Sequence, residues 1–258
     1  MRKLTIYLAV MIASFTLLFG VIRSLPFYRC SADFNPQVVE SSYVDDTLKV
    51  AIIGDSWAAL HRPYDNSLES MLLDSHSCAR VYSRGFPGAK SRDIYQEMVS
   101  SIESLQRENL DYGVLFAGIN DAVTLMGNDF YVYHYLLMVR LLLNLGIKPV
   151  VVDMPDVNYH AVAGREPLKI RAFHYFSSFI TGARMYDFSE YRSALKDELQ
   201  KTYLLDSVVY INAEAWNADG YRDKRGLYME DETHLNALGY HVLDSCIVSN
   251  ILRDMNKR

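Results

Sequence analysis

The chain has 258 residues, a formal net charge of −5 and a calculated pI of about 5.8. Half of the residues are hydrophobic and 22% are charged, which is typical of a globular protein with a sizeable core. Because the balance is acidic and no long basic patch occurs, nucleic acid is excluded as an expected partner.

The N-terminal segment is the first predicted element. Residues 4–22 carry no charge and follow Arg2 and Lys3. As a helix this stretch would be roughly 28 Å long, close to a hydrocarbon thickness of about 30 Å. A cleaved signal peptide is the alternative, but Ile22-Arg23-Ser24 is a poor cleavage context. We therefore predict an uncleaved transmembrane helix that serves as a signal anchor.

The predicted domain organisation follows from this anchor. Residues 1–23 form the anchor, residues 24–46 form a polar juxtamembrane linker, and residues 47–258 form one catalytic domain. A slight excess of positive charge before the apolar run favours a membrane-anchored protein with its domain outside the cytoplasm, for example in a periplasm.

The remaining chain alternates between strand and helix patterns. Short β-branched-rich runs predict five buried strands, near residues 50–53, 79–83, 112–117, 148–154 and 207–211. Helical patterns cover about residues 58–61, 67–73, 91–105, 129–145, 166–205 and 237–255, the last with Asn236 as its N-cap. This alternation predicts a three-layer α/β/α, flavodoxin-like domain with a five-stranded parallel sheet.

Polar and glycine-rich segments follow the first three strands, where open α/β sheets bind ligands. Gly54-Asp55-Ser56 follows the first strand; taken alone, it also fits a plain strand-to-helix turn with Ser56 as N-cap. The turn that contains Gly88 follows the second strand and nearly imitates a phosphate-binding loop. Ala89 stands where that loop needs glycine before the lysine, so we interpret the turn as a source of backbone N–H donors. Gly118-Ile119-Asn120-Asp121 follows the third strand.

A candidate acid–histidine pair follows the last strand. Asp231 and His234 are three residues apart, so the carboxylate can reach the imidazole and turn its other nitrogen toward Ser56. Nucleophilic acyl transfer needs a nucleophile, a base, a group that orients the base, and donors for the oxyanion. The other histidines are interpreted as surface or capping residues: His61, His76, His134, His160, His174 and His241.

Together these four segments resemble the SGNH (GDSL-type) hydrolase family over about residues 49–251. The resemblance implies Ser56 as nucleophile and His234 as general base, oriented by Asp231. It also implies an oxyanion hole from the N–H groups of Ser56 and Gly88 and the side chain of Asn120.

Two positions depart from the family pattern. Trp57 stands where the family often has leucine. The position before the second segment, the turn that contains Gly88, is commonly asparagine in the family, and here it is Ser83 or Arg84. Trp57, Asp55 and Asp121 are candidate substrate-pocket residues, and Trp57 also fits a packing role beneath the first helix.

The resemblance implies a serine esterase that removes small acyl groups, acetyl first, from a cell-surface carbohydrate. The same residues would serve a polysaccharide O-acetyltransferase, in which a sugar hydroxyl replaces water. A lipid-directed esterase (lysophospholipase or thioesterase) is a third candidate, although no amphipathic lid is evident, and a non-catalytic binding module on this fold is a fourth. The sequence leaves the oligomeric state open.

No metal or other cofactor is predicted. The cysteines, Cys30, Cys78 and Cys246, fit no metal-binding spacing and no disulfide framework, although one unspecified pair could bridge. The chain also lacks the His-Glu-x-x-His pattern of a metal hydrolase.

Overall fold

The computed structural model describes residues 2–24, 46–61, 67–76, 78–165, 167–181 and 188–257. Most of the predicted linker over residues 24–46, with Cys30, lies outside the described residues. Cys78 and Cys246 are both free thiols.

A five-stranded parallel sheet forms the centre of the domain, in the order β2-β1-β3-β4-β5. The strands are β1 (Leu48–Gly54), β2 (Ala79–Gly85), β3 (Tyr112–Phe116), β4 (Lys148–Val152) and β5 (Val209–Ile211). All five lie where the sequence predicts them, and the order is that of flavodoxin-like folds. Helices cover both faces, so the central strands are continuous apolar runs; every residue of β3 is buried.

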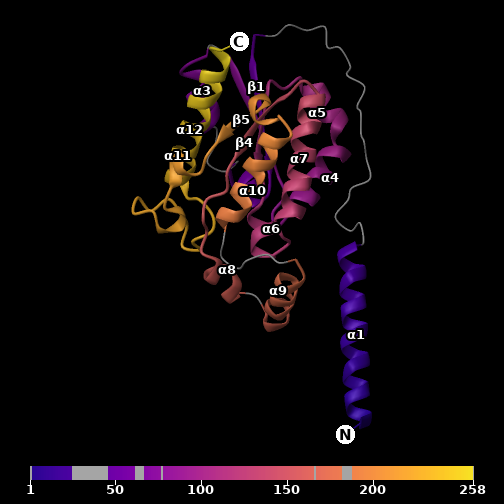
Figure 1. Ribbon diagram of the computed structural model, residues 1–258. Helices are drawn as coiled ribbons and strands as arrows, with labels where there is room; N and C mark the ends of the chain where they lie inside the picture. Colours follow the sequence, from indigo (N-terminus) through magenta and orange to yellow (C-terminus); the bar gives the residue numbers. More distant parts are fainter. Residues whose placement is uncertain are drawn as a thin grey trace.

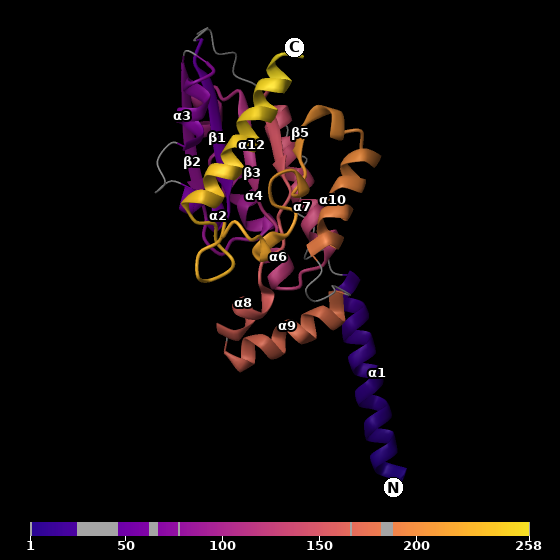
Figure 2. The same ribbon diagram turned by 90° about the vertical axis from the view of Figure 1, so that its left-hand side faces the viewer.

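Helices form the two outer layers (Figures 1 and 2). One face is covered by α2 (Ser56–His61), α3 (Ser67–Leu73) and α12 (Ala237–Met255). The other is covered by α4 (Ser91–Ser100), α5 (Ile102–Glu108), α7 (Asn128–Asn144) and α10 (Phe188–Lys201). The predicted three-layer architecture is thus confirmed.

Shorter elements complete the chain. At the carboxyl ends of the strands lie α6 (Ile119–Val123), α8 (Tyr159–Arg165) and α9 (Leu168–Thr181), seen below the sheet in Figure 1. Around β5 lie η3 (Leu205–Ser207), α11 (Glu214–Asn217) and η4 (Gly220–Arg222). The last two fall in a segment that the sequence predicts to be loop.

Two predicted helices are divided. The predicted helix over residues 91–105 breaks at Ser101, whose backbone leaves the helical region and whose hydroxyl donates to the Glu97 carbonyl at 2.5 Å. A serine that bonds the backbone locally competes with the helix ladder, which explains the break. The predicted stretch over residues 166–205 contains two separate helices, α9 and α10.

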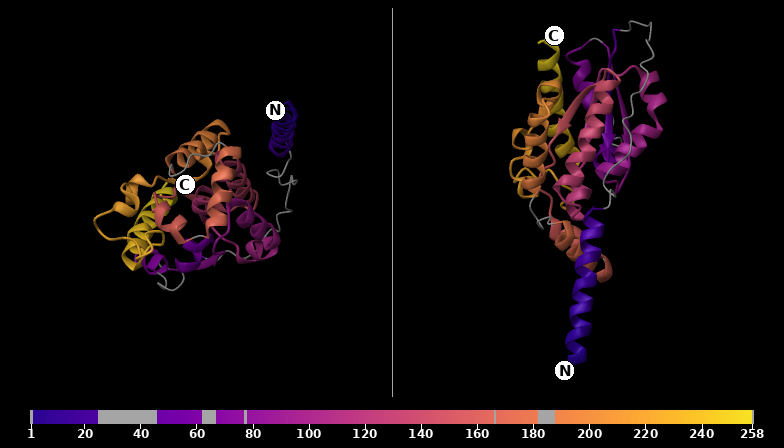
Figure 3. Two further views of the ribbon diagram at one scale, coloured as in Figure 1. Left: turned by 90° about the horizontal axis from the view of Figure 1, so that it is seen from below. Right: turned by 45° about the vertical axis from the view of Figure 1, so that its right-hand side comes forward.

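The N-terminal helix α1 (Arg2–Ser24) projects beyond the α/β domain (Figure 3). The sequence predicts a transmembrane anchor here, but among the described residues no helix is both long and apolar enough to cross a bilayer. The predicted transmembrane anchor is therefore not confirmed.

Candidate active site

The register of the sheet brings the first three sequence segments to one level. Gly54 at the end of β1 pairs with Gly85 of β2 on one side and with Phe116 of β3 on the other. Ser56, Gly88 and Asn120 each follow within four residues of that level, so they emerge from the same edge of the sheet. This edge is where open parallel sheets bind ligands.

Gly54 is needed because the neighbouring strand approaches its backbone closely. A Cβ added at this position would lie 2.1 Å from the Phe116 carbonyl oxygen, a distance that no side chain tolerates. The backbone N–H of Asp55 donates to that same oxygen at 3.0 Å, which ties the start of the nucleophile segment to β3.

Ser56 is the first residue of α2, and Asp55 rather than Ser56 caps the helix. The Asp55 carboxylate accepts a hydrogen bond from the Trp57 N–H at 2.9 Å, as an N-cap side chain does. The Ser56 hydroxyl is therefore not used to cap α2, in contrast to the plain-turn interpretation of this segment.

The structure brings Ser56, His234 and Asp231 into one hydrogen-bonded chain. His234 Nε2 lies 2.9 Å from Ser56 Oγ, and His234 Nδ1 lies 2.5 Å from Asp231 Oδ2. The other carboxylate oxygen of Asp231 accepts the backbone N–H groups of Thr233 and His234 at 3.0 and 2.9 Å. The ring is thus held from one side, with its second nitrogen directed at the serine.

The environment of Asp231 keeps it ionised. Burial by itself would raise the pKa of this carboxyl. Hydrogen bonds from the His234 N–H, the His234 ring and the Thr233 N–H outweigh that effect, and they hold the pKa below its ordinary value. An ionised carboxylate at Nδ1 favours the tautomer with its proton on Nδ1, which leaves Nε2 free to accept the serine proton.

Candidate oxyanion donors lie on the two neighbouring segments. Gly88 has φ +78°, a conformation that favours glycine, and the space where a Cβ would sit is open, so a ligand can approach the backbone there. The Asn120 amide donates one hydrogen bond to the Ala89 carbonyl at 3.0 Å and lies 3.5 Å from Asp55 Oδ2. Asn120 thereby connects the second segment to the first.

Asp55, Asp121 and Trp57, the candidate pocket residues, are all buried, with at most 2% of their surface exposed. Asp121 accepts the Ser91 N–H and hydroxyl at 2.8 and 2.6 Å, which fixes the start of α4. Burial raises the pKa of Asp55 to about 7 and that of Asp121 to about 6, although hydrogen bonds to each lower it. Their observed contacts are structural.

Several solved structures share this fold. A GDSL-like lipase from Bacteroides thetaiotaomicron superimposes with a TM-score of 0.54 at 14% identity, covering 80% of this chain and 88% of that one. The esterase EstA from a Pseudoalteromonas species gives 0.56 at 13%, covering 82% and 100%. An acetylxylan esterase from Geobacillus stearothermophilus gives 0.53 at 15%, covering 79% and 94%. The chain has the GDSL hydrolase fold.

Sequence comparison adds nothing to this likeness. No protein-family model matches the chain, and no curated protein matches it. At identities this low, the solved structures establish only the fold. The chemistry has to be argued from the residues of this chain.

Trp57 links the two halves of the site in this version of the GDSL hydrolase fold. Its indole N–H donates to the Thr233 carbonyl at 3.2 Å, and its own carbonyl accepts the Tyr240 hydroxyl at 2.9 Å. The ring packs edge-on against Phe116, Trp216 and Tyr228. The side chain therefore packs beneath the site and fastens the loop of His234 to the helix of Ser56.

A second set of contacts holds the same loop from α8. The backbone N–H of Asn158 donates to the Glu232 carbonyl at 3.0 Å, and the two side chains are also hydrogen-bonded. Arg165 donates to the Asp231 carbonyl at 3.1 Å. Sequence reasoning missed Asn158 and Arg165, because they lie in a segment without a motif and more than 60 residues from their partners.

The six histidines that the sequence analysis interpreted as surface or capping residues take no part in this chain of bonds, but His61, His134 and His174 are buried, so the surface interpretation was wrong for these three. His61 pairs with Asp244 at 2.7 Å in the interior, and this pair ties α2 to α12. His134 is buried and bonds the Phe130 carbonyl within α7. Among the residues that the structure describes, no group of acidic, histidine and cysteine side chains could hold a metal ion.

Proposed function

We propose that the chain is a serine esterase that hydrolyses small acyl esters through Ser56, His234 and Asp231. One observation carries the proposal: His234 lies within hydrogen-bond distance of both the Ser56 hydroxyl and the Asp231 carboxylate. A hydroxyl, an imidazole and a carboxylate in this order are the groups that activate a serine.

The geometry supports a two-step mechanism. Ser56 Oγ attacks the ester carbonyl carbon while His234 Nε2 takes the hydroxyl proton, and the carbonyl electron pair moves onto its oxygen. The Ser56 and Gly88 N–H groups and the Asn120 amide would stabilise that oxyanion. The alcohol leaves with the proton from His234, so that an acyl-serine remains. Water then repeats the sequence, and the carboxylic acid and the free serine are regenerated.

Acetyl esters of a carbohydrate are the substrate class that we propose. The likeness to an acetylxylan esterase supports this choice. The cavity that Asp55, Trp57, Phe116 and Asp153 help to line has a volume of only about 10 Å³. A location of the domain outside the cytoplasm stays a prediction from the N-terminal sequence.

Hydrolysis of p-nitrophenyl acetate by the full-length chain tests the proposal. We expect steady release of nitrophenolate that falls at least about a thousandfold in Ser56→Ala. Ser249→Ala, which removes an exposed hydroxyl of α12, should hydrolyse the ester as the wild type does. Equal rates in Ser56→Ala and the wild type would refute the assignment.

The same assay separates hydrolysis from acyl transfer. An acyl-enzyme can be resolved by a sugar hydroxyl when the site favours it over water. With a xylooligosaccharide added, a hydrolase gives acetate in proportion to nitrophenolate, whereas an O-acetyltransferase gives acetylated sugar, which mass spectrometry detects.

A further inference from the structure

Helix α9 presents an apolar, aromatic face that the domain does not cover. Six of its large apolar side chains are exposed, at 43–79% of their surface: Leu168, Ile170, Phe173, Tyr175, Phe176 and Phe179. Phe173, Phe176 and Phe179 recur every third residue and so form one stripe along the helix. The opposite side faces the protein, where His174 is buried. Soluble monomers rarely expose contiguous apolar surface of this kind unless something binds it.

The charges of α9 indicate what binds. The helix carries Lys169 and Arg171, both exposed, and no acidic residue. An aromatic stripe combined with basic side chains is the pattern of a helix that lies in the headgroup region of a membrane. Anionic lipid headgroups complement the two cations, because basic side chains close to such a surface strengthen binding to it.

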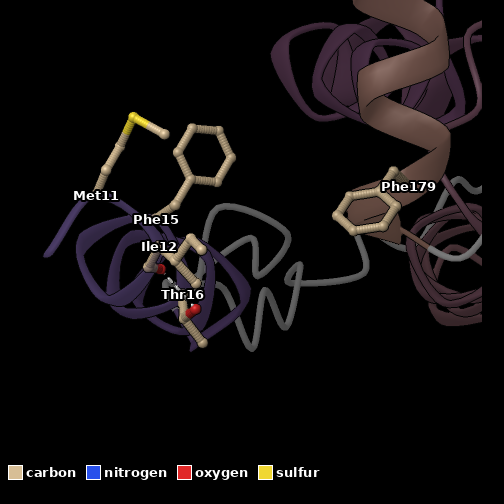
Figure 4. Close-up of a pocket in the computed structure, with 5 residues that line it drawn as sticks. All are labelled: Met11, Ile12, Phe15, Thr16 and Phe179. Atoms are coloured by element: carbon tan, nitrogen blue, oxygen red, sulfur yellow. Dashed lines mark hydrogen bonds between the residues drawn. The ribbon is translucent and has the colours of Figure 1, made fainter. Parts of the chain in front are cut away.

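The apolar surface continues from α9 onto α1. The Phe15 and Phe176 rings meet edge-on with centroids 6.0 Å apart. Beside them lies an open groove of about 430 Å³, lined by Met11, Ile12, Phe15, Thr16 and Phe179 (Figure 4). The Thr16 hydroxyl is already donated to the Ile12 carbonyl at 2.8 Å, so the groove offers a ligand apolar surface, as an acyl chain requires.

The face is placed next to the candidate active site. In Figures 1 and 2, α9 lies beyond α6 and α8, at the end of the domain where the strands have their carboxyl ends. The preceding helix α8 ends at Arg165, which donates to the Asp231 carbonyl. A surface bound by α9 would therefore lie against the edge of the sheet that carries Ser56.

We propose that α9 docks the protein on an anionic lipid bilayer, with its phenylalanines in the interfacial region and Lys169 and Arg171 at the headgroups. The docked protein then holds its catalytic edge at the membrane surface. The sequence analysis found no amphipathic segment here, because an apolar composition suggests burial unless the neighbouring elements are known. This inference goes beyond the proposed esterase activity and does not depend on it.

Hydrogen-exchange mass spectrometry of the full-length chain, with and without lipid vesicles, tests the docking. Phosphatidylcholine vesicles and vesicles with 30% phosphatidylglycerol serve as the probes. We expect vesicles to protect the amides of α9, more strongly when phosphatidylglycerol is present. The triple variant Phe173→Ser/Phe176→Ser/Phe179→Ser should lose that protection and bind anionic vesicles at least about tenfold more weakly.

Two further variants complete the experiment. Leu73→Ser/Tyr203→Ser/Leu238→Ser removes exposed apolar side chains at other positions, and it should bind as the wild type does. Lys169→Gln/Arg171→Gln keeps the aromatic stripe and should bind anionic vesicles about tenfold more weakly, with little change on neutral ones. This charge variant also carries the test if the triple variant fails to fold. Any binding through α1 is common to all of these chains.

Three outcomes would overturn the proposal. The first is that vesicles do not protect the α9 amides from hydrogen exchange. The second is that the triple variant binds vesicles as tightly as the wild type does. The third is an assembly in solution that the triple variant, but not the control, converts to monomers, because the face would then join copies of this chain. None of these readouts requires turnover, so a failure here is distinct from a failure of the esterase assignment.

Discussion

The two halves of the candidate site are held in different ways. Ser56 follows a central strand whose backbone is packed between its neighbours, whereas His234 lies in the irregular segment between η4 and α12. The serine is placed by strand register and close backbone contact. The histidine is placed by side chains that reach it from elsewhere: Asp231, Trp57, Asn158 and Arg165. Substitutions that crowd the strand contacts should therefore affect folding, whereas substitutions of the side chains that hold His234 should affect catalysis.

The largest expected effect is on the histidine half. In Asp231→Asn the side-chain oxygen can still accept the N–H groups of Thr233 and His234, so the loop should keep its shape. The amide no longer selects the productive tautomer, and kcat for p-nitrophenyl acetate should fall by about 10⁴. Circular dichroism and kinetics on the same samples check this. A variant that retains more than a tenth of wild-type kcat would show that Asp231 does not orient the base.

Asn120→Ala tests whether the half of the site that follows the strand ends supplies an oxyanion donor. The loss of one oxyanion donor should lower kcat by about 10²–10³, because the developing charge loses its amide partner. Thr124→Ala serves as the control, since it removes the hydroxyl that donates to the Asn120 carbonyl and leaves the amide side chain in place. If both variants lose activity equally, Asn120 acts by shaping α6 and not as a donor.

Gly54→Ala tests the same half by its packing. The added methyl group meets the Phe116 carbonyl and has no room to move, so the free energy of unfolding should fall by about 2–3 kcal/mol or more. Gly164→Ala is the matched control: a Cβ there has open space and the residue is helical. Urea titration should find the control unchanged or more stable by up to about 1 kcal/mol. Equal stabilities for the two variants would contradict the close strand contact.

The carboxyls of the two regions should respond to pH in opposite directions. Burial raises the pKa of Asp153, at the end of β4, to about 6, so its stabilising effect is present below pH 4 and is lost as the pH rises through about 6. The pKa of Asp231 is lowered, so its contribution is present above about pH 4 and is lost on acidification below it.

Asp153→Asn isolates the first effect, because the amide oxygen can still accept the Tyr210 hydroxyl. Relative to the wild type, the variant should gain about 2 kcal/mol in unfolding free energy between pH 4 and pH 7. Urea titrations at the two pH values measure it. A difference that stays constant between them would show that Asp153 titrates normally.

The smallest expected effect concerns the link between the halves. Trp57→Phe removes the indole N–H that bonds the Thr233 carbonyl, and the loss of about 1 kcal/mol should lower kcat about fivefold. Trp216→Phe is the control, since its buried indole N–H has no hydrogen-bond partner among the described residues. If the two variants lose kcat to the same extent, packing and not the hydrogen bond positions the loop.

The comparison also explains what could be predicted from the sequence. Strands such as Val50–Ile53 are apolar runs closed by glycine, and this local pattern predicts both the sheet and the places where Ser56 and Asn120 emerge. The pairing of Asp231 with His234 could also be predicted from a local pattern, because the two residues are three positions apart. The sequence also predicts Asn236 as the cap of α12, and its side chain accepts the Gly239 N–H at 3.0 Å.

Contacts between distant segments could not be predicted where no family motif marks them. Nothing near Asn158 in the sequence indicates that it meets Glu232, and nothing near Trp57 indicates that it reaches Thr233. The break at Ser101 depends on one side-chain hydrogen bond that helical periodicity does not register. The exposed face of α9 was missed because apolar composition suggests burial unless the neighbouring elements are known.

Covalent labelling with a fluorophosphonate probe, followed by peptide mass spectrometry, tests the central claim most directly. The account predicts one modified residue, Ser56, with a labelling rate that falls at least about a hundredfold in His234→Ala, because the hydroxyl then has no base. Labelling of a different serine, or a rate at Ser56 that does not depend on His234, would contradict it.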